Sequence, residues 1–332
     1  MLSLPSEVQL DIFKFLTYEK LYSIKQIHLY FCDFINNYEG ELAREKFYGI
    51  SIDVDRFKKG PYSKLIEPKT KNFYFPLNEE LEEKWRNRRE TPIPLYLLPR
   101  KANNIVICLS KVYGTECHLL QLPNFIKNKV DLKIVYYYLN KLFNYYFEEG
   151  NFRGFILNPK LIQLLFGNVP KQFYIQTSWL FMDYVIGDKF QFILNHLIIN
   201  GTLTINFPPD KDATKYTDIL FKILMNGDKF NEVCLKCINL QGIFDRIIDH
   251  IETSTECSKM VAKIELKNHL TPFTILNERA EKIEEKREDG HLIATTYQLF
   301  NKFNPEIKFS ILYKKNCYVT EYKVIEIKRI YC

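Results

Sequence analysis

The sequence lacks the patterns that mark several large classes of protein. No stretch approaches the run of about 18 apolar residues that a membrane-spanning helix requires. The first residues have neither a charged start nor an apolar core, so we expect no signal peptide. We therefore expect a cytosolic or nuclear protein, not bound to a membrane, whose 8 cysteines are reduced thiols.

Catalytic signatures are also missing. The chain contains no nucleophile elbow (GxSxG), no dinucleotide loop (GxGxxG), no phosphate loop (GxxxxGK[ST]) and no HExxH zinc motif. Cys234 and Cys237 form a single CxxC without a second pair of ligands, and we interpret both as core thiols. We therefore predict that the protein is not an enzyme and that it needs no metal and no cofactor.

Composition indicates a folded chain with mild basic character. Of the 332 residues, 46% are hydrophobic, which is enough for a substantial core. The 46 basic and 40 acidic residues leave a formal charge of +6, which hints at an acidic partner. Since the cationic residues form no stripe, we do not expect nucleic acid to be that partner.

The rest of the chain is organised around the stretch from Leu4 to Phe47. Either Pro5 takes the first helical position, or Ser6 caps the helix with Gln9 three residues on. Helical spacing then continues through two further short helices, the first of which Thr17 could cap. A module of this size cannot enclose all of its large apolar residues. Some of them must therefore contact another part of the chain or a partner.

These residues carry a resemblance to a known family. The opening LPxEV, followed by Ile12-Phe13, resembles an F-box, and the likeness covers about the first 40 residues. His28 departs from many relatives, which carry Cys or Asn there, and Phe31 stands where Trp is frequent. The resemblance implies that the module binds a SKP-family adaptor and, through it, the cullin and RING subunits of an SCF-type ubiquitin ligase. The implied adaptor-binding residues are Leu4, Pro5, Glu7, Val8, Ile12, Phe13, Leu16, Leu21, Ile24, Ile27 and Phe31.

The chain divides by composition into three predicted parts. Residues 1–47 are the F-box-like helical module, and residues 48–100 are a proline-rich linker with one charged helix near residues 78–89. Residues 101–332 are an α/β domain that would bind an unknown protein substrate. The whole chain also resembles nematode F-box proteins with divergent C-terminal domains.

The α/β domain shows a period of about 30 residues. Four strand-like segments are centred at Phe173, Leu203, Val233 and Lys263, and a helix-length segment follows each of the first three. We expect an irregular, leucine-rich-repeat-like parallel sheet; a closed α/β domain without repeats is the alternative. A further cycle would place a helix at 292–300 and strands at 309–313 and 318–328.

Two functions of different classes remain open. The first is a substrate-recognition adaptor of the ubiquitin ligase, working through proximity rather than bond chemistry. The second is a non-catalytic interaction or scaffold protein with no role in ubiquitin transfer. In either case the strand side of the domain is the expected binding face. Its generic candidates are Tyr174, Gln176, Thr204 and Asn206.

Overall fold

The computed structural model describes residues 4–54, 63–66, 68, 83, 92–97, 105–113, 117–167, 171–268, 280–288, 291–315 and 323–330. No helix among them is long and apolar enough to cross a membrane. The helices are α1 (Ser6–Lys14), α2 (Tyr18–Ile27), α3 (Leu29–Asn37), α5 (Lys129–Phe143), α6 (Pro159–Phe166), α7 (Ile186–His196), α8 (Thr217–Leu224) and α9 (Gln241–Thr253).

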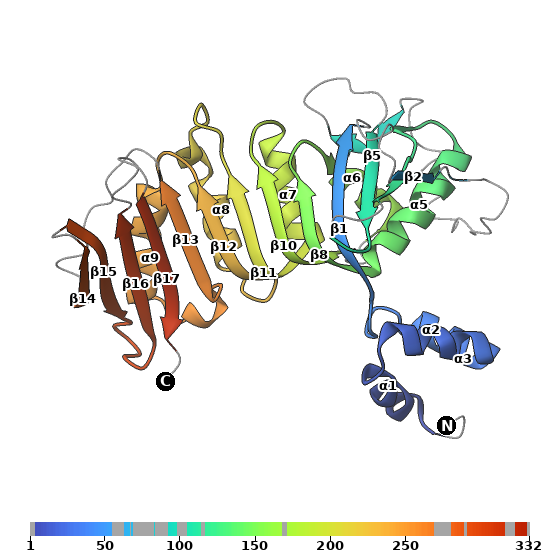
Figure 1. Ribbon diagram of the computed structural model, residues 1–332, viewed down its shortest axis with the longest axis horizontal. Helices are drawn as coiled ribbons and strands as arrows, with labels where there is room; N and C mark the ends of the chain where they lie inside the picture. The colour runs from blue at the N-terminus through green and yellow to red at the C-terminus, as the bar shows by residue number, and fades with distance from the viewer. Residues whose placement is uncertain are drawn as a thin grey trace. The chain divides into compact units, whose positions relative to one another are not determined.

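The fold is α/β. Within the described residues, 13 strands pair in the order β14-β15-β16-β17-β13-β12-β11-β10-β8-β1-β5-β6-β2 (Figure 1). The strands are β1 (Glu45–Val54), β2 (Ser63–Ile66), β5 (Ile105–Ser110), β6 (Cys117–Leu120), β8 (Tyr145–Phe152), β10 (Phe173–Phe181), β11 (Leu197–Asn206), β12 (Phe230–Lys236), β13 (Lys263–Asn268), β14 (Glu281–Glu288), β15 (His291–Phe300), β16 (Lys308–Lys315) and β17 (Lys323–Ile330). Two small ladders join β3 (Ile93–Pro94) to β7 (Phe125–Ile126) and β4 (Tyr96–Leu97) to β9 (Ile156–Leu157).

The chain groups into two compact units. Unit 1 comprises Met1–Leu95, Asn103–Glu148 and Lys160–Tyr174; unit 2 comprises Tyr96–Ala102, Glu149–Pro159 and Ile175–Cys332. This grouping cuts across the boundary that the sequence indicates at residue 100.

Unit 1 contains the three N-terminal helices and the strands around β1. The apolar run Ile105–Leu109 lies in β5, which pairs antiparallel with β1. Helix α5 begins where Asn128 accepts a hydrogen bond from the Asp131 amide, at 2.8 Å. Residues 45–47 of the predicted helical module and residues 48–54 of the expected linker together form β1, so this part of the linker lies inside the sheet. Of the predicted charged helix, only Glu83 is described, and it is helical; its other residues lie outside the described ranges.

Unit 2 alternates strands and helices from β10 to β13, as the spacing predicts. Strands β11 and β12 pair in parallel, as do β12 and β13. Leu203 lies opposite Val233, and Val233 lies opposite Ile264, so paired residues are 30 or 31 positions apart. The helices α7, α8 and α9 lie on one face of these strands (Figure 1).

The C-terminal part of unit 2 differs from the prediction. Residues 291–300 form strand β15, not a helix, because their buried side chains alternate with a period of two. Together with β14, β16 and β17 they extend the sheet by antiparallel pairs. The last strand is Lys323–Ile330; residues 318–322 of the predicted strand lie outside the described ranges.

The close approach of β10 and β11 requires a glycine at position 201. A Cβ placed there would lie 2.6 Å from the backbone oxygen of Gln176, which is nearer than a carbon can approach. We expect Gly201→Ala to lower the free energy of unfolding by roughly 1–3 kcal/mol, because the two strands must separate. Urea unfolding monitored by circular dichroism measures the change.

Gly242→Ala is the matched control. A Cβ at Gly242 meets no heavy atom within 4 Å, and the residue lies in the first turn of α9. Alanine there should be neutral or stabilising by up to about 1 kcal/mol. Equal stability of Gly201→Ala and wild type would contradict the account of the strand contact.

Candidate protein-interaction surface of the helical module

The three N-terminal helices enclose a small core of their own. Its buried residues are Leu10, Phe13, Leu21, Phe34, Ile35 and Leu42. The ring of Phe13, which is 0% exposed, packs edge-on against Phe34 at 5.5 Å between centroids. A second contact joins Phe13 to Phe31 at 5.9 Å. These contacts hold α1 against α3.

Neither predicted start of α1 matches the structure in full. Ser6 is the first helical residue, and Pro5 occupies the N-cap position without a side-chain cap. The carbonyl of Pro5 accepts the first helical hydrogen bond from the Gln9 amide, at 3.0 Å. Because proline lacks an N–H, its place just before the helix leaves no additional amide donor unsatisfied.

Helix α1, together with its C-cap residue Phe15, has a second apolar side, on which Ile12 packs against the core whereas Val8 and Phe15 lie away from it. At 3.6 residues per turn, Val8, Ile12 and Phe15 fall within about 60° of one another, and Phe13 lies roughly on the opposite side. Val8 is 43% exposed and Phe15 is 89% exposed, while Ile12 is half-buried. The helix therefore presents apolar side chains both to its own core and to the outside.

The connection between α2 and α3 exposes further apolar side chains. Ile27 is 75% exposed and Leu29 is 80% exposed. The hydroxyl of Tyr30, next in the chain, donates to the Gln9 side-chain oxygen at 3.0 Å, and Gln9 in turn donates to the Leu4 carbonyl at 2.7 Å. These two hydrogen bonds bring the start of α3 next to the start of α1. We call the exposed group Leu4, Val8, Phe15, Ile27, Leu29 and Tyr30 the apolar surface of the module.

In the structure, the sequence-predicted site residues are buried, half-buried or exposed. Phe13 and Leu21 are buried in the core. Ile12, Leu16, Ile24 and Phe31 are half-buried and pack against that core. The exposed ones are Leu4, Pro5, Glu7, Val8 and Ile27. Prediction from sequence omitted Phe15, Leu29 and Tyr30 from the site, although the spacing of Phe15 from Val8 and Ile12 was a usable signal.

His28 has a structural role at the start of α3. Its backbone is extended at the junction of α2 and α3, and its Nδ1 accepts a hydrogen bond from the Tyr30 amide at 3.1 Å. It is therefore the N-cap of α3, a position in which asparagine is also favourable. A histidine in place of asparagine at position 28 therefore still accepts the capping hydrogen bond from the Tyr30 amide.

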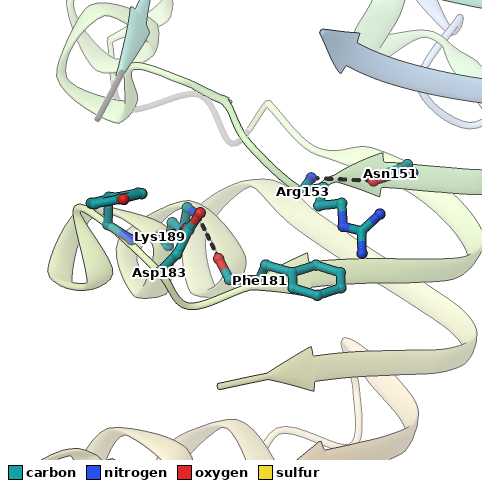
Figure 2. A network of polar contacts seen from close by, with 6 residues as sticks. Asn151, Arg153, Phe181, Asp183 and Lys189 are labelled. Atoms are coloured by element: carbon teal, nitrogen blue, oxygen red, sulfur yellow. Dashed lines mark hydrogen bonds and ion pairs between the residues drawn. The ribbon is translucent and has the colours of Figure 1, made fainter. Parts of the chain in front are cut away.

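Unit 2 contains a second candidate, a buried lysine. Lys189 on α7 donates to the Phe181 carbonyl at 2.5 Å and to the Asp183 carboxylate at 2.6 Å (Figure 2). Burial lowers the pKa of Lys189, and the Asp183 carboxylate opposes that shift. Nearby, the guanidinium of Arg153 lies 4.3 Å from the centre of the Phe181 ring.

These bonds give Lys189 a structural role. The loop between β10 and α7 contains Asp183 and also Val185, whose φ of 44° is a conformation that a β-branched residue rarely adopts. The ammonium group holds the end of β10 and this loop against the first turn of α7. We therefore do not assign catalysis to Lys189.

The two CxxC cysteines are buried thiols. Burial raises the pKa of both Cys234 and Cys237 to about 12, so neither is a thiolate near neutral pH. Across the described residues, no group of three or more His, Cys, Asp or Glu side chains could hold a metal ion.

Comparison with known proteins gives one match. Residues 66–208 match a family model described as a domain of unknown function, DUF8381. No F-box family model matches the chain. No curated protein and no solved structure matches.

Truncation of Phe13 in α1 should be far more costly than truncation of Phe15, the C-cap residue of the same helix. We expect Phe13→Ala to destabilise the helical module by about 3–5 kcal/mol, because a fully buried ring leaves a cavity. Phe15→Ala should change stability by less than about 0.5 kcal/mol, because the ring lies in solvent. Hydrogen exchange of the α1 amides in each variant provides the measurement. Similar losses of protection in the two variants would contradict the assignment of inner and outer faces.

The cap at His28 should tolerate asparagine but not alanine. We expect His28→Ala to weaken the first turn of α3 by about 1 kcal/mol, because the Tyr30 amide loses its acceptor. His28→Asn is the matched control and should retain wild-type protection of that amide against hydrogen exchange. Equal protection in the alanine variant and wild type would exclude the capping role.

Proposed function

We propose that the protein is a substrate-recognition adaptor of an SCF-type cullin–RING ubiquitin ligase. The apolar surface of the helical module would bind a SKP-family adaptor, and the α/β domain would bind a protein substrate. The proposal places the protein in the cytosol or the nucleus, without a catalytic residue or cofactor of its own.

The observation that carries the proposal is the second apolar face of α1. The module already has a filled core around Phe13, so Val8 and Phe15 do not contribute to it. Exposed apolar side chains gathered on adjoining elements are typical of protein interfaces. Three residues of the apolar surface, Leu4, Val8 and Ile27, are among those implied by the likeness of the N-terminus to an F-box.

The parallel strand pairs support a more specific proposal about the architecture of the α/β domain. We infer that β10 to β13 with α7 to α9 are strand–helix units of an irregular leucine-rich-repeat-like kind. The offsets of 30 and 31 residues between paired positions support a repeated unit. Such stacks present the strand side to their ligands.

Under this proposal the protein works by proximity. The ligase carries ubiquitin as a thioester, and the adaptor holds the substrate so that its lysines are near that bond. Tethering raises the effective concentration of one reactant around the other. The chain then needs two binding surfaces and a defined connection between them.

A stand-alone scaffold protein is the second candidate. The full burial of Phe13 and Leu21 by the chain itself favours it, because those two residues are not accessible to a partner. The exposure of Leu4 and Pro5 favours the adaptor.

Binding to a purified SKP-family adaptor tests the proposal. We expect Val8→Ala combined with Phe15→Ala to raise the dissociation constant by at least about tenfold, because each buried anchor of an interface contributes on the order of 2 kcal/mol. Isothermal titration calorimetry on the full chain measures the constant.

Phe303→Ala is the matched control, because Phe303 is 69% exposed and lies in unit 2. It should bind as wild type does. If the wild-type chain binds no SKP-family adaptor, the scaffold function is favoured.

A further inference from the structure

One face of the unit 2 sheet is polar and faces away from the helices. Along β12, Val233 and Leu235 are buried, whereas Glu232 and Lys236 point to the opposite side and are half-exposed. The same alternation holds on β13, where Ile264 and Leu266 are buried. The helices α7, α8 and α9 lie on the apolar side (Figure 1). We call the other side the open face.

Strand pairing aligns the open-face residues of β11, β12, β13, β17 and β16 into three rows. The first row is Thr202, Glu232, Lys263, Lys328 and Ser310. The second is Thr204, Cys234, Glu265, Glu326 and Leu312. The third, at the carboxyl ends of the parallel strands, is Asn206, Lys236, Lys267, Val324 and Lys314. The third row therefore contains three lysines and no carboxylate.

The carboxylates of the first two rows already have partners. Glu326 lies 3.3 Å from the Lys263 ammonium and 2.9 Å from that of Lys328. Burial alone would raise the pKa of Glu326, but these two lysines lower it overall. Glu265 pairs with Lys267 at 2.9 Å, and Glu232 accepts a hydrogen bond from the Thr202 hydroxyl at 3.0 Å.

Two lysines of the third row remain without an ion pair. Among the described residues, the side chains of Lys236 and Lys314 form neither a hydrogen bond nor an ion pair. The loop after β11 carries two acids that have partners of their own: Asp210 lies 3.7 Å from Lys211, and Asp212 accepts hydrogen bonds from the Thr214 amide and hydroxyl. Within the part of the chain that the structure describes, the third row of the open face thus carries an excess of positive charge.

The geometry points to an acidic, extended protein segment as the ligand of this row. We propose that such a segment crosses the strands along the third row, with one carboxylate at Lys236 and a second at Lys314. This assignment rests on the proposed function, since it specifies which substrates unit 2 would hold.

The separation of the two lysines defines the spacing of the carboxylates. Strands β12 and β16 are separated by β13 and β17, so three steps of about 4.8 Å place Lys236 and Lys314 about 14 Å apart. An extended chain advances about 3.4 Å per residue, so four residues cover about the same distance. The ligand should therefore carry acidic residues at positions i and i+4. Val324 lies between the lysines and offers an apolar contact.

A series of fluorescein-labelled peptides tests the spacing on the full-length protein. All members have nine residues in a serine and valine background and carry two glutamates, separated by one, two or four positions. We expect the last peptide to bind at least about fivefold more tightly than the first, because only its glutamates reach both lysines. Fluorescence anisotropy in low salt measures each dissociation constant.

Charge reversal identifies the lysines involved. Lys236→Glu combined with Lys314→Glu should raise the dissociation constant of the peptide with the four-position spacing by at least about tenfold. The reason is that two attractions between lysine and glutamate become repulsions. The matched control, Lys215→Glu combined with Lys222→Glu, makes the same change in net charge on α8 and the turn before it. It should change binding by less than about twofold. Circular dichroism checks that both variants are folded.

The peptide experiments can overturn the assignment of the acidic segment without touching the proposed adaptor function. Equal binding of all peptides, no binding of any, or equal effects of the two double variants overturns the inference. A single-stranded oligonucleotide that displaces the peptide at lower concentration than an acidic competitor also overturns it in favour of nucleic acid. The SKP-adaptor titration is independent, so either proposal can fail while the other stands.

Discussion

The packing of Phe13 against α3 is the contact on which the functional account depends. Its ring fills the centre of the helical module and thereby fixes which side of α1 turns inward. Once that side is fixed, helix geometry turns Val8 and Phe15 outward. A nine-residue helix with apolar residues on both sides cannot bury them all within three short helices. The outward side is therefore available to a partner.

A comparable constraint shapes unit 2. Side chains alternate between the two faces of a strand, and parallel pairing aligns the same face of β11, β12 and β13. The helices take the apolar face, which leaves the polar residues together on the other. Where acids and lysines alternate, they neutralise one another; at the carboxyl ends of the parallel strands, lysines are in excess. The apolar surface of the helical module and the open face of unit 2 thus have the same origin. In each, a helix or a set of strands packs through one face and leaves the other face exposed.

The sequence predicted the strand–helix alternation from β10 to β13 because local periodicity and chain spacing determine it. The same 30-residue period misled the prediction for 292–300. There the alternation of Thr295, Tyr297 and Leu299 was the better signal, and it matches strand β15. The prediction also missed strand β1, because its partner β5 lies more than 50 residues further along the chain and pairing at that distance leaves no local pattern. In the candidate site, periodicity identified the apolar residues of α1 but not which of its two sides turns inward.

Amide hydrogen exchange of the full-length protein, with and without a SKP-family adaptor, tests the central claim most directly. The account predicts that the adaptor protects α1 and the junction of α2 and α3, with little change in the amides of unit 2. Unchanged exchange in the helical module at saturating adaptor, or protection confined to the sheet, would contradict it.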